Sequence, residues 1–188
     1  KDNEVYAPSF REGEEVVLIR YPHAGTFEIP RLTVTHRNPE GKSTIGDTRD
    51  AIGINPKTAE QLSGADFDGD NVLVIPTSGV NIQAKKPLAA LKDFDPKEEY
   101  KGYPGMHKMT EREKHLEMGR VSNLITDMTL LGAPEEDIVR AVKHSMVVID
   151  AKKHNLDYRR SEQENDIPGL RKKWLGREDA GASTLISR

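Results

Sequence analysis

The residues best suited to chemistry are three aspartates that alternate along one short segment, Asp66, Asp68 and Asp70. In an extended chain alternate side chains share a face, so the three carboxylates can converge on one point. Gly69 allows the tight backbone that such convergence needs. Clustered carboxylates repel one another and lose hydration together, and all-oxygen ligands suit Mg²⁺, Mn²⁺ or Ca²⁺. We therefore predict a metal site at Asp66, Asp68 and Asp70.

A solvated acidic turn is the simplest alternative to a metal site in this segment. Such a turn needs no metal, but the segment leads directly into the apolar run Val72–Ile75, which places the carboxylates at the end of an expected core strand.

Two other kinds of site also have closely spaced aspartates. In a phosphatase-type Asp-x-Asp-Gly element the aspartates follow the apolar strand, whereas here the strand comes after the aspartates. A Mg²⁺-dependent hydrolase of that kind remains a third hypothesis. The spacing excludes an EF-hand, because Thr77 takes the place of its bidentate Glu.

Arg20 is the main candidate for a substrate contact outside the acidic segment. It follows the apolar run Val16–Ile19 and lies shortly before Pro22. A guanidinium in such a place offers a planar fork of donors to ribose or phosphate oxygens, and an exposed arginine at a strand end is the alternative. Other basic residues of this half could extend a basic strip along a template: His23, Arg31, His36 and Arg37.

The N-terminal half has the pattern of short β-strands. Apolar, β-branched runs predict strands over 16–19, 29–35 and 72–75, and a weaker one over 51–54. We expect 38–42 to form a turn and Asn55-Pro56 to end the weaker strand. Short strands with irregular spacing favour a small closed barrel over a sandwich. We place this barrel at 1–83.

The C-terminal half changes to a helical period, so the expected fold class is α+β. Residues 84–109 are polar and rich in turn residues, which predicts a linker or surface arm. Thr110 and Glu113 form a capping box that begins a helical hairpin over 110–157. The apolar faces predicted for the two helices are Val121, Leu124, Ile125, Met128 and Leu131, and then Ile138, Ala141, Val142, Ser145, Met146 and Ile149. We expect 158–188 to be a charged, loosely ordered tail with Trp174 as its anchor.

Composition limits the function classes. The chain has 188 residues, a net charge of −3, 31% charged residues and no cysteine. No apolar run approaches the ~20 residues that cross a bilayer, and the charge excludes a basic coat for nucleic acid. Disulfides and thiolate metal sites are excluded as well. The chain begins with Lys1 rather than Met, and we expect it to be part of a larger protein.

The segment Gly64–Asp70 resembles the catalytic loop of two-barrel RNA polymerases. This superfamily includes the largest subunit of cellular RNA polymerase, the RNA-dependent RNA polymerases of gene silencing and single-chain polymerases of phages and prophages. The largest subunit typically has Asn-Ala-Asp-Phe-Asp-Gly-Asp, from which Gly64 departs, and Ser63-Gly64-Ala65 is closer to the silencing enzymes. Val17–Pro22 resembles the strand and Arg-x-Pro element of both branches. Ile54-Asn55-Pro56 resembles their His-Pro element, with Asn55 in place of the His.

Two segments of the C-terminal half add to the resemblance. Gly119–Leu124 looks like a helix of the silencing-type enzymes, and His144-Ser145 with Val148–Lys152 resembles their His-Ser…Val-Asp-x-x-Lys segment. The resemblance covers about residues 16–153 and is closest to the single-chain phage or silencing branch.

The resemblance implies a double-psi β-barrel followed by a helical region, and nucleotidyl transfer as the activity. Asp66, Asp68 and Asp70 would hold the catalytic Mg²⁺, with Mn²⁺ as a substitute, and Arg20 and Gly69 would contact the substrate. The implied partners are a nucleic-acid template, the RNA product, nucleoside triphosphates and a second barrel from another part of the protein or another subunit. The implied location is the cytoplasm of a bacterium or phage-infected cell, with no membrane. These residues alone would be inactive. The alternative is an accessory module that binds metal or nucleic acid without polymerising.

Overall fold

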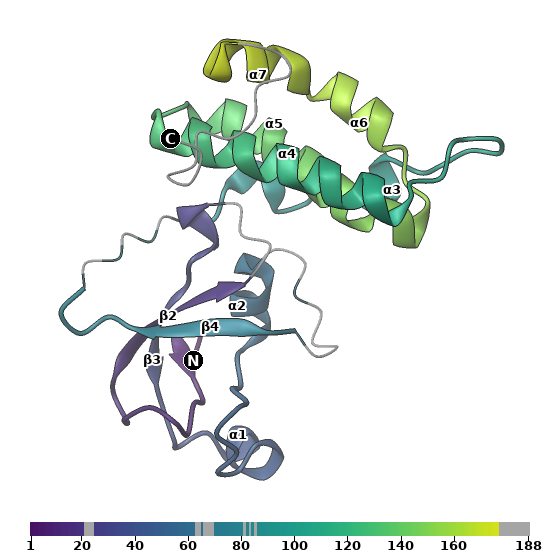
Figure 1. Ribbon diagram of the computed structural model, residues 1–188. Coiled ribbons are helices and arrows are strands. Elements are labelled where there is room, and N and C mark those ends of the chain that lie inside the picture. The colour runs from purple at the N-terminus through teal and green to yellow at the C-terminus, as the bar shows by residue number, and fades with distance from the viewer. Residues whose placement is uncertain are drawn as a thin grey trace. The chain divides into compact units, whose positions relative to one another are not determined.

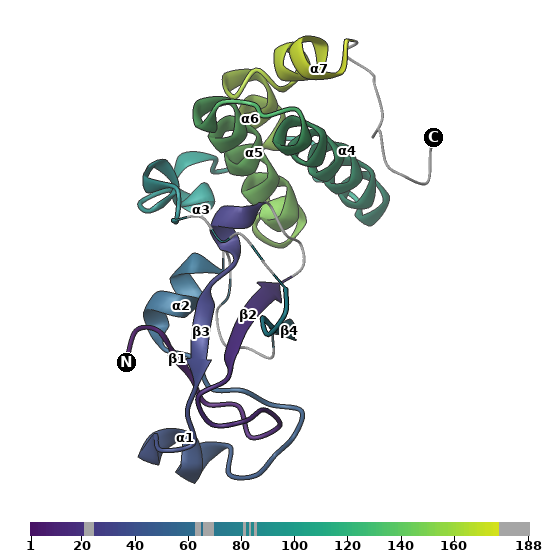
Figure 2. The ribbon, with the colours of Figure 1, turned by 90° about the vertical axis from the view of Figure 1, so that its left-hand side faces the viewer.

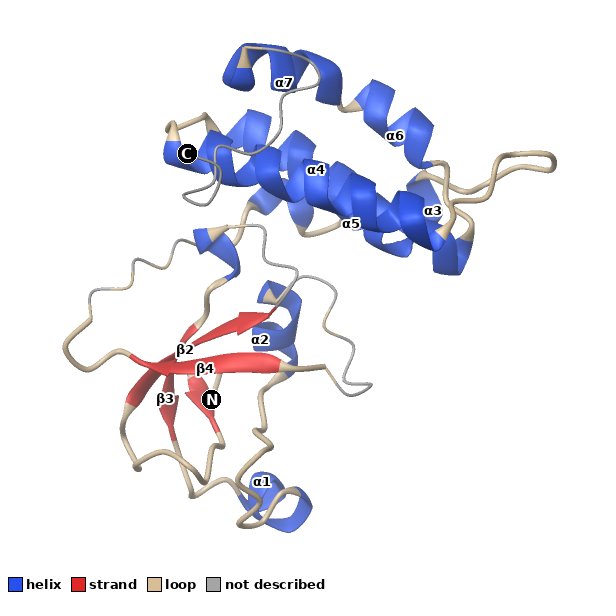
Figure 3. Cartoon of the chain, viewed as in Figure 1, coloured by secondary structure: helices blue, strands red, loops and turns tan. Residues whose placement is uncertain are grey.

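The computed structural model describes residues 1–20, 25–62, 65, 70–80, 82, 84 and 86–176. The chain is α+β and divides into two compact units, Lys1–Pro87 and Leu88–Arg188 (Figure 1). The described strands all belong to the first unit, and the long helices belong to the second (Figure 3). None of the described helices is both long enough and apolar enough to cross a membrane.

Strands of the first unit form one mixed sheet in the order β1-β3-β2-β4. The strands are β1 (Glu4–Val5), β2 (Glu15–Arg20), β3 (Arg31–Val34) and β4 (Val72–Pro76). β1 runs parallel to β3, and β2 pairs antiparallel with both β3 and β4. The three strong apolar runs of the sequence therefore form strands as predicted. Among the described strands β4 lies at an edge of the sheet, and its Leu73 is 60% exposed.

β2 lies at the centre of the apolar core of this unit. Val16 and Leu18 are fully buried on one face of the sheet, where they join the main cluster of the unit. Val17 points to the opposite face, because side chains alternate along a strand, and it is also fully buried. The helix α2 (Pro56–Gln61) lies beside the sheet (Figure 2), and Leu62 at its end adds to the core. Arg20 thus extends from a strand that is covered on both faces and paired on both sides.

Two Asn-Pro pairs begin short helices, which corrects two sequence predictions. α1 (Pro39–Thr44) occupies most of the segment expected to be a turn, and α2 follows Asn55 directly. In both helices the Asn side chain accepts a hydrogen bond from a backbone N–H of the first turn, and the Pro occupies that turn. The weaker strand predicted over 51–54 is not part of the described sheet. Gly53 instead makes an isolated antiparallel bridge with Tyr6.

The second unit is built on a helical hairpin of α4 (Glu111–Leu130) and α5 (Glu135–His154). The shorter helices all contact α5 (Figure 1): η2 (Ala89–Leu91), α3 (Pro96–Glu99), α6 (Tyr158–Glu164) and α7 (Ile167–Leu175). The predicted capping box is confirmed, because Thr110 N donates to Glu113 Oε2 at 2.7 Å and Glu113 N donates to Thr110 Oγ1 at 3.3 Å. In the first unit, the 3₁₀ helix η1 (Thr26–Glu28) leads towards β3.

The buried faces of the two long helices match the predictions in part. α4 buries the predicted residues Val121, Leu124, Ile125 and Met128, but Leu131, which follows the helix, is 60% exposed. On α5 the predicted Ala141 and Val142 are buried, whereas the rest of its buried set differs: Asp137, Val139, His144, Val147, Val148 and Ala151. Because α5 contacts α4, α3, α6 and α7, its buried surface is wider than one apolar stripe.

The segment expected to be a linker, 84–109, is packed against the hairpin over part of its length. Phe94, Tyr100 and Met109 are buried in one cluster with Val147 and Val148 of α5. These apolar side chains are widely spaced and separated by polar and turn residues, so they produce no recognisable period.

The charged tail expected at 158–188 forms the two helices α6 and α7 over its first part, which corrects the expectation of loose order there. Ile167 and Leu170 are buried. The predicted anchor is confirmed, because Trp174 Nε1 donates to Asp137 Oδ2 at 3.0 Å. Residues 177–188 lie outside the described part of the chain.

Candidate metal and substrate site

The pairing of β2 with β4 brings the two candidate segments of the sequence together. In this ladder Arg20, the last residue of β2, is the partner of Val72, the first residue of β4. Asp70 lies two residues before Val72, so its side chain falls at the same end of the ladder as Arg20. The two residues are 50 positions apart in the sequence, and the antiparallel register is what makes them neighbours.

Arg20 and Asp70 form a close ion pair. Arg20 Nε donates to Asp70 Oδ1 at 2.8 Å, and Arg20 Nη2 donates to the same oxygen at 2.6 Å. Both side chains are about four-fifths buried, with 18% and 19% of their surface exposed. Charge-assisted hydrogen bonds of this length are stronger than neutral ones. The pair therefore fixes the Asp70 carboxylate at the end of the β2–β4 ladder.

The other predicted metal-ligating residues, Asp66 and Asp68, lie outside the described residues, as does Gly69. Within the described part of the chain, His, Asp and Glu side chains form no group of three or more that could hold a metal ion. Of the predicted site residues, the structure thus brings together Arg20 and Asp70, and the remaining positions stay predictions.

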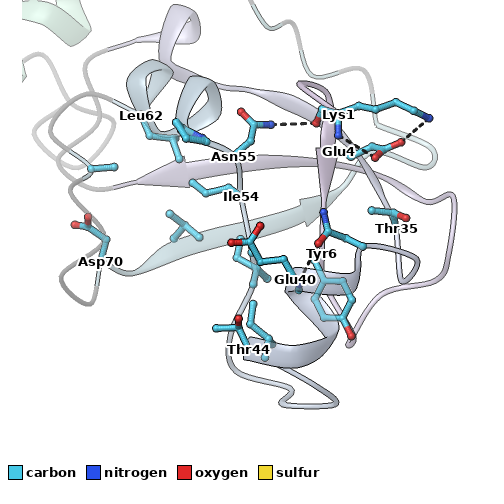
Figure 4. A pocket seen from close by; sticks show the side chains of 18 residues that line it. Lys1, Glu4, Tyr6, Thr35, Glu40, Thr44, Ile54, Asn55, Leu62 and Asp70 are labelled. Atoms are coloured by element: carbon cyan, nitrogen blue, oxygen red, sulfur yellow. Dashed lines mark hydrogen bonds and ion pairs between the residues drawn. The ribbon is translucent and has the colours of Figure 1, made fainter.

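A pocket of ≈ 690 Å³ extends from Asp70 across the first unit. Its walls include Glu4 of the edge strand β1 and Val72 of the edge strand β4, together with Tyr6 just after β1 and Ile54. Figure 4 shows Asp70 on one side of the pocket and Glu4, Tyr6 and Thr35 on the opposite side. Glu40 of α1 also lines the pocket. Neither Glu40 nor Tyr6 was predicted from the sequence, and recognising Asn38-Pro39 as a helix start would have placed Glu40 on a helix.

Lys1 and Glu4, which both line the pocket, form an ion pair. Lys1 Nζ lies 3.0 Å from Glu4 Oε1, and this lysine holds the pKa of Glu4 below its usual range. The Lys57 ammonium lowers the pKa of Asp2 in the same way. Both carboxylates are therefore ionised at neutral pH and already have cationic partners.

Asn55, at the position where the sequence resemblance would place a His, has a structural role. Its Oδ1 accepts a hydrogen bond from Thr58 N at 2.9 Å and so caps α2. Its Nδ2 donates to Lys1 O at 3.1 Å and to Asp2 O at 3.0 Å. The side chain thus ties the segment before β1 to the start of α2, with its polar atoms engaged by backbone groups.

The expected basic strip is only partly described. His36 Nε2 lies 3.0 Å from Phe10 O, Arg37 Nε lies 3.3 Å from Glu12 Oε1, and Arg31 Nη2 donates to Ile82 O at 3.2 Å. His23 lies outside the described residues. These contacts are local to the first unit and give the three described residues structural partners.

The polymerase-like segments of the second unit contribute mainly to its core. His144 is 1% exposed, and its Nδ1 lies 3.1 Å from Ser161 Oγ. Burial lowers the pKa of His144 to about 3, with a further contribution from the Arg171 guanidinium, so the imidazole is neutral at pH 7. Val121 and Leu124, within the other segment, are fully buried on α4. At the surface Lys152 pairs with Glu111.

Comparison of the chain with protein-family models, with curated proteins and with solved structures gives no significant match.

Proposed function

We propose that this chain is the part of a nucleic-acid-templated RNA polymerase that carries the metal-binding Asp loop for nucleotidyl transfer. The observation that carries the proposal is the ion pair between Arg20 and Asp70. The sequence resemblance assigns one of these residues to the Arg-x-Pro element and the other to the Asp loop. Their contact supports the view that both elements serve one site.

The proposed architecture around this site is a double-psi β-barrel. Residues of β1 and β4, the two edges of the described sheet, line the same pocket. The bridge between Tyr6 and Gly53 brings a further segment between them. A sheet whose edges face a common space is curled rather than flat, which is the starting point for barrel closure.

The donor set fits Mg²⁺. Aspartate carboxylates are hard oxygen ligands, and Mg²⁺ is usually bound by one or two carboxylates together with waters and substrate phosphates. Asp70 keeps about a fifth of its side chain exposed. Bound at Asp66, Asp68 and Asp70, Mg²⁺ would activate a 3′-hydroxyl and stabilise charge at the α-phosphate of the incoming nucleotide.

The residues of the chain have distinct tasks in this proposal. The aspartates hold the cation and leave positions open for substrate oxygens. Arg20 orients Asp70 and presents N–H donors to ribose or phosphate oxygens of the substrate. A second barrel supplies the remaining contacts to the nucleotide, so the 188 residues alone are inactive in RNA synthesis.

The test is RNA synthesis by the complete gene product on a primed template. Asp68→Ala is expected to abolish nucleotide incorporation and to leave the far-ultraviolet circular dichroism unchanged. Asp47→Ala, an exposed residue of the same unit, is the matched control and should retain full activity. Unchanged incorporation by Asp68→Ala would remove the metal site from the mechanism. Template binding without incorporation by the wild-type product would instead identify an accessory module that does not polymerise.

A further inference from the structure

The pocket of ≈ 690 Å³ in the first unit has the features of a site for a small organic molecule. Its volume lies within the range of ~300–1,000 Å³ that is typical of such sites. We infer that it binds a small amine, whose apolar body contacts the aliphatic side chains of the pocket and whose ammonium group contacts Glu40 of α1. This inference goes beyond the proposed polymerase function and does not rest on a metal site.

The apolar part of the pocket is held in place by the core of the unit. Its aliphatic side chains are Ile45, Ile52, Ile54, Leu62 and Val72. The last four belong to the core cluster around β2 or pack against it. An apolar body that enters the pocket removes this surface from water, which favours binding.

Close backbone packing fixes the wall that carries Glu40. Tyr6 N donates to Gly53 O at 2.9 Å, and Gly53 N donates to Tyr6 O at 2.8 Å. Just beyond α1, Gly46 O accepts a hydrogen bond from Tyr6 Oη at 2.9 Å. A Cβ atom at Gly41 would lie 2.5 Å from Tyr6 Cγ, so α1 approaches the Tyr6 ring more closely than any other residue at this position would allow. The pocket is therefore formed before a ligand arrives.

The charges around the pocket leave one carboxylate for a ligand. Lys1 pairs with Glu4, and Asp70 pairs with Arg20. Ser43 Oγ donates to the backbone oxygen of Glu40, whereas the Glu40 carboxylate has no hydrogen-bond or ion-pair partner among the described residues. Figure 4 shows this carboxylate directed into the pocket. The complementary ligand therefore carries a positive charge.

An ammonium group suits this carboxylate better than a metal ion does. Glu40 and Thr44 both line the pocket and are four residues apart on α1, so they lie on the same face of the helix. An ammonium has three N–H donors and no acceptor, so it can donate to the Glu40 carboxylate and to the Thr44 hydroxyl together. A divalent cation needs several oxygen ligands, which one free carboxylate does not supply.

Binding of three matched probes to the full 188-residue chain tests the inference. Tryptamine, tryptophol and indolepropionate share an indole body and end in an ammonium, a hydroxyl and a carboxylate group. Each is titrated while the backbone amide resonances are followed by NMR. Tryptamine is expected to bind about fivefold more tightly than tryptophol, and indolepropionate should bind most weakly. The amides of Gly53 and Ile54 should shift, and those of α5 should stay in place.

Two substitutions locate the charge that the amine recognises. Glu40→Gln keeps the size of an exposed side chain and removes its charge, so tryptamine and tryptophol should then bind within about twofold of each other. Glu60→Gln is the matched control, because Glu60 is an exposed residue of α2 and is not among the residues that line the pocket. It should keep the preference for tryptamine. Added salt should narrow the preference in wild type.

Each other outcome overturns the inference. Equal affinity of wild type for tryptamine and tryptophol would remove the role of the ammonium group. Equal loss of tryptamine affinity in Glu40→Gln and Glu60→Gln would indicate a general attraction of cations to an acidic surface. Shifts confined to the second unit, or no saturation at millimolar tryptamine, would place no amine site in this pocket. None of these measurements involves RNA synthesis, so the proposed function and the amine site can fail separately.

Discussion

Mild acid should destabilise the second unit through His144. This residue is almost completely buried on α5, and its Nε2 has no hydrogen-bond partner among the described residues. Burial, and then the charge of Arg171 on α7, lower its pKa from 6.5 to about 3. At pH 5 the imidazole is therefore neutral in the folded chain and mostly protonated in the unfolded chain.

The sign and size of the effect follow from this difference in pKa. Between pH 3 and pH 6.5 the unfolded chain binds more protons than the folded chain, so the free energy of unfolding falls as the pH is lowered. For pKa values of 6.5 and about 3, lowering the pH from 7 to 5 removes about 2 kcal/mol. The loss grows as the pH approaches 3 and levels off below it.

Urea unfolding at pH 7 and pH 5 measures this loss, with the fluorescence of the single tryptophan, Trp174, as the probe of the second unit. His144→Gln cannot titrate in this range, and its change in stability between the two pH values should be smaller by about 2 kcal/mol. His115→Gln removes an exposed histidine of α4 and should keep the wild-type dependence. Equal losses in wild type and His144→Gln would refute the reasoning.

Two further substitutions test how the helices of the second unit are held. Thr110→Ala removes the cap of α4 and should lower the free energy of unfolding by about 1 kcal/mol. Thr126→Ala, inside the same helix, is the control, and an effect of Thr110→Ala no larger than that of Thr126→Ala would contradict a capping role. Asp137→Ala leaves the indole N–H of Trp174 without its acceptor and should cost about 2 kcal/mol. The same variant should shift the emission of Trp174 to longer wavelength, whereas Glu136→Ala, an exposed acidic residue of the same turn, should leave the emission unchanged.

Short helices are one part of the fold that sequence patterns failed to predict. Asn38-Pro39, Asn55-Pro56 and Asp95-Pro96 each act as an N-cap followed by a proline in the first turn. The same pairs favour turns, because Asn and Asp bond to nearby backbone and Pro presets the backbone angle of a turn. A helix of 6 residues, such as α1, is too short to show an apolar period, so local sequence does not separate the two outcomes.

The buried face of a long helix was predicted correctly where only one side of the helix is covered by other elements. α4 packs its predicted stripe against α5 and α7, and periodicity was sufficient there. α5 is covered from several directions, so polar groups such as His144 and Asp137 are also buried. The hydrophobic pattern of the sequence does not identify buried polar residues of this kind, because their burial depends on hydrogen-bond partners contributed by α6 and α7.

The candidate site was also predicted only in part from the sequence. Residue types and spacing identified Arg20 and Asp70 separately, since each lies at the end of a strongly apolar strand. Their contact depends on the register of β2 with β4, which neither strand encodes alone. Nothing in the local sequence indicated that Asp70 has an arginine as its hydrogen-bond partner.

β4, the strand that follows the Asp segment, also affects how readily the chain aggregates. β4 lies at the edge of the described sheet with Leu73 facing solvent, and such an edge is a template for pairing with another polypeptide. Pro76 lacks an N–H and limits pairing at one end of the strand. At high protein concentration, aggregation is expected to begin along Val72–Ile75. A neighbouring strand that covered this edge would protect the chain from aggregation and would also form one wall of the entrance to Asp70.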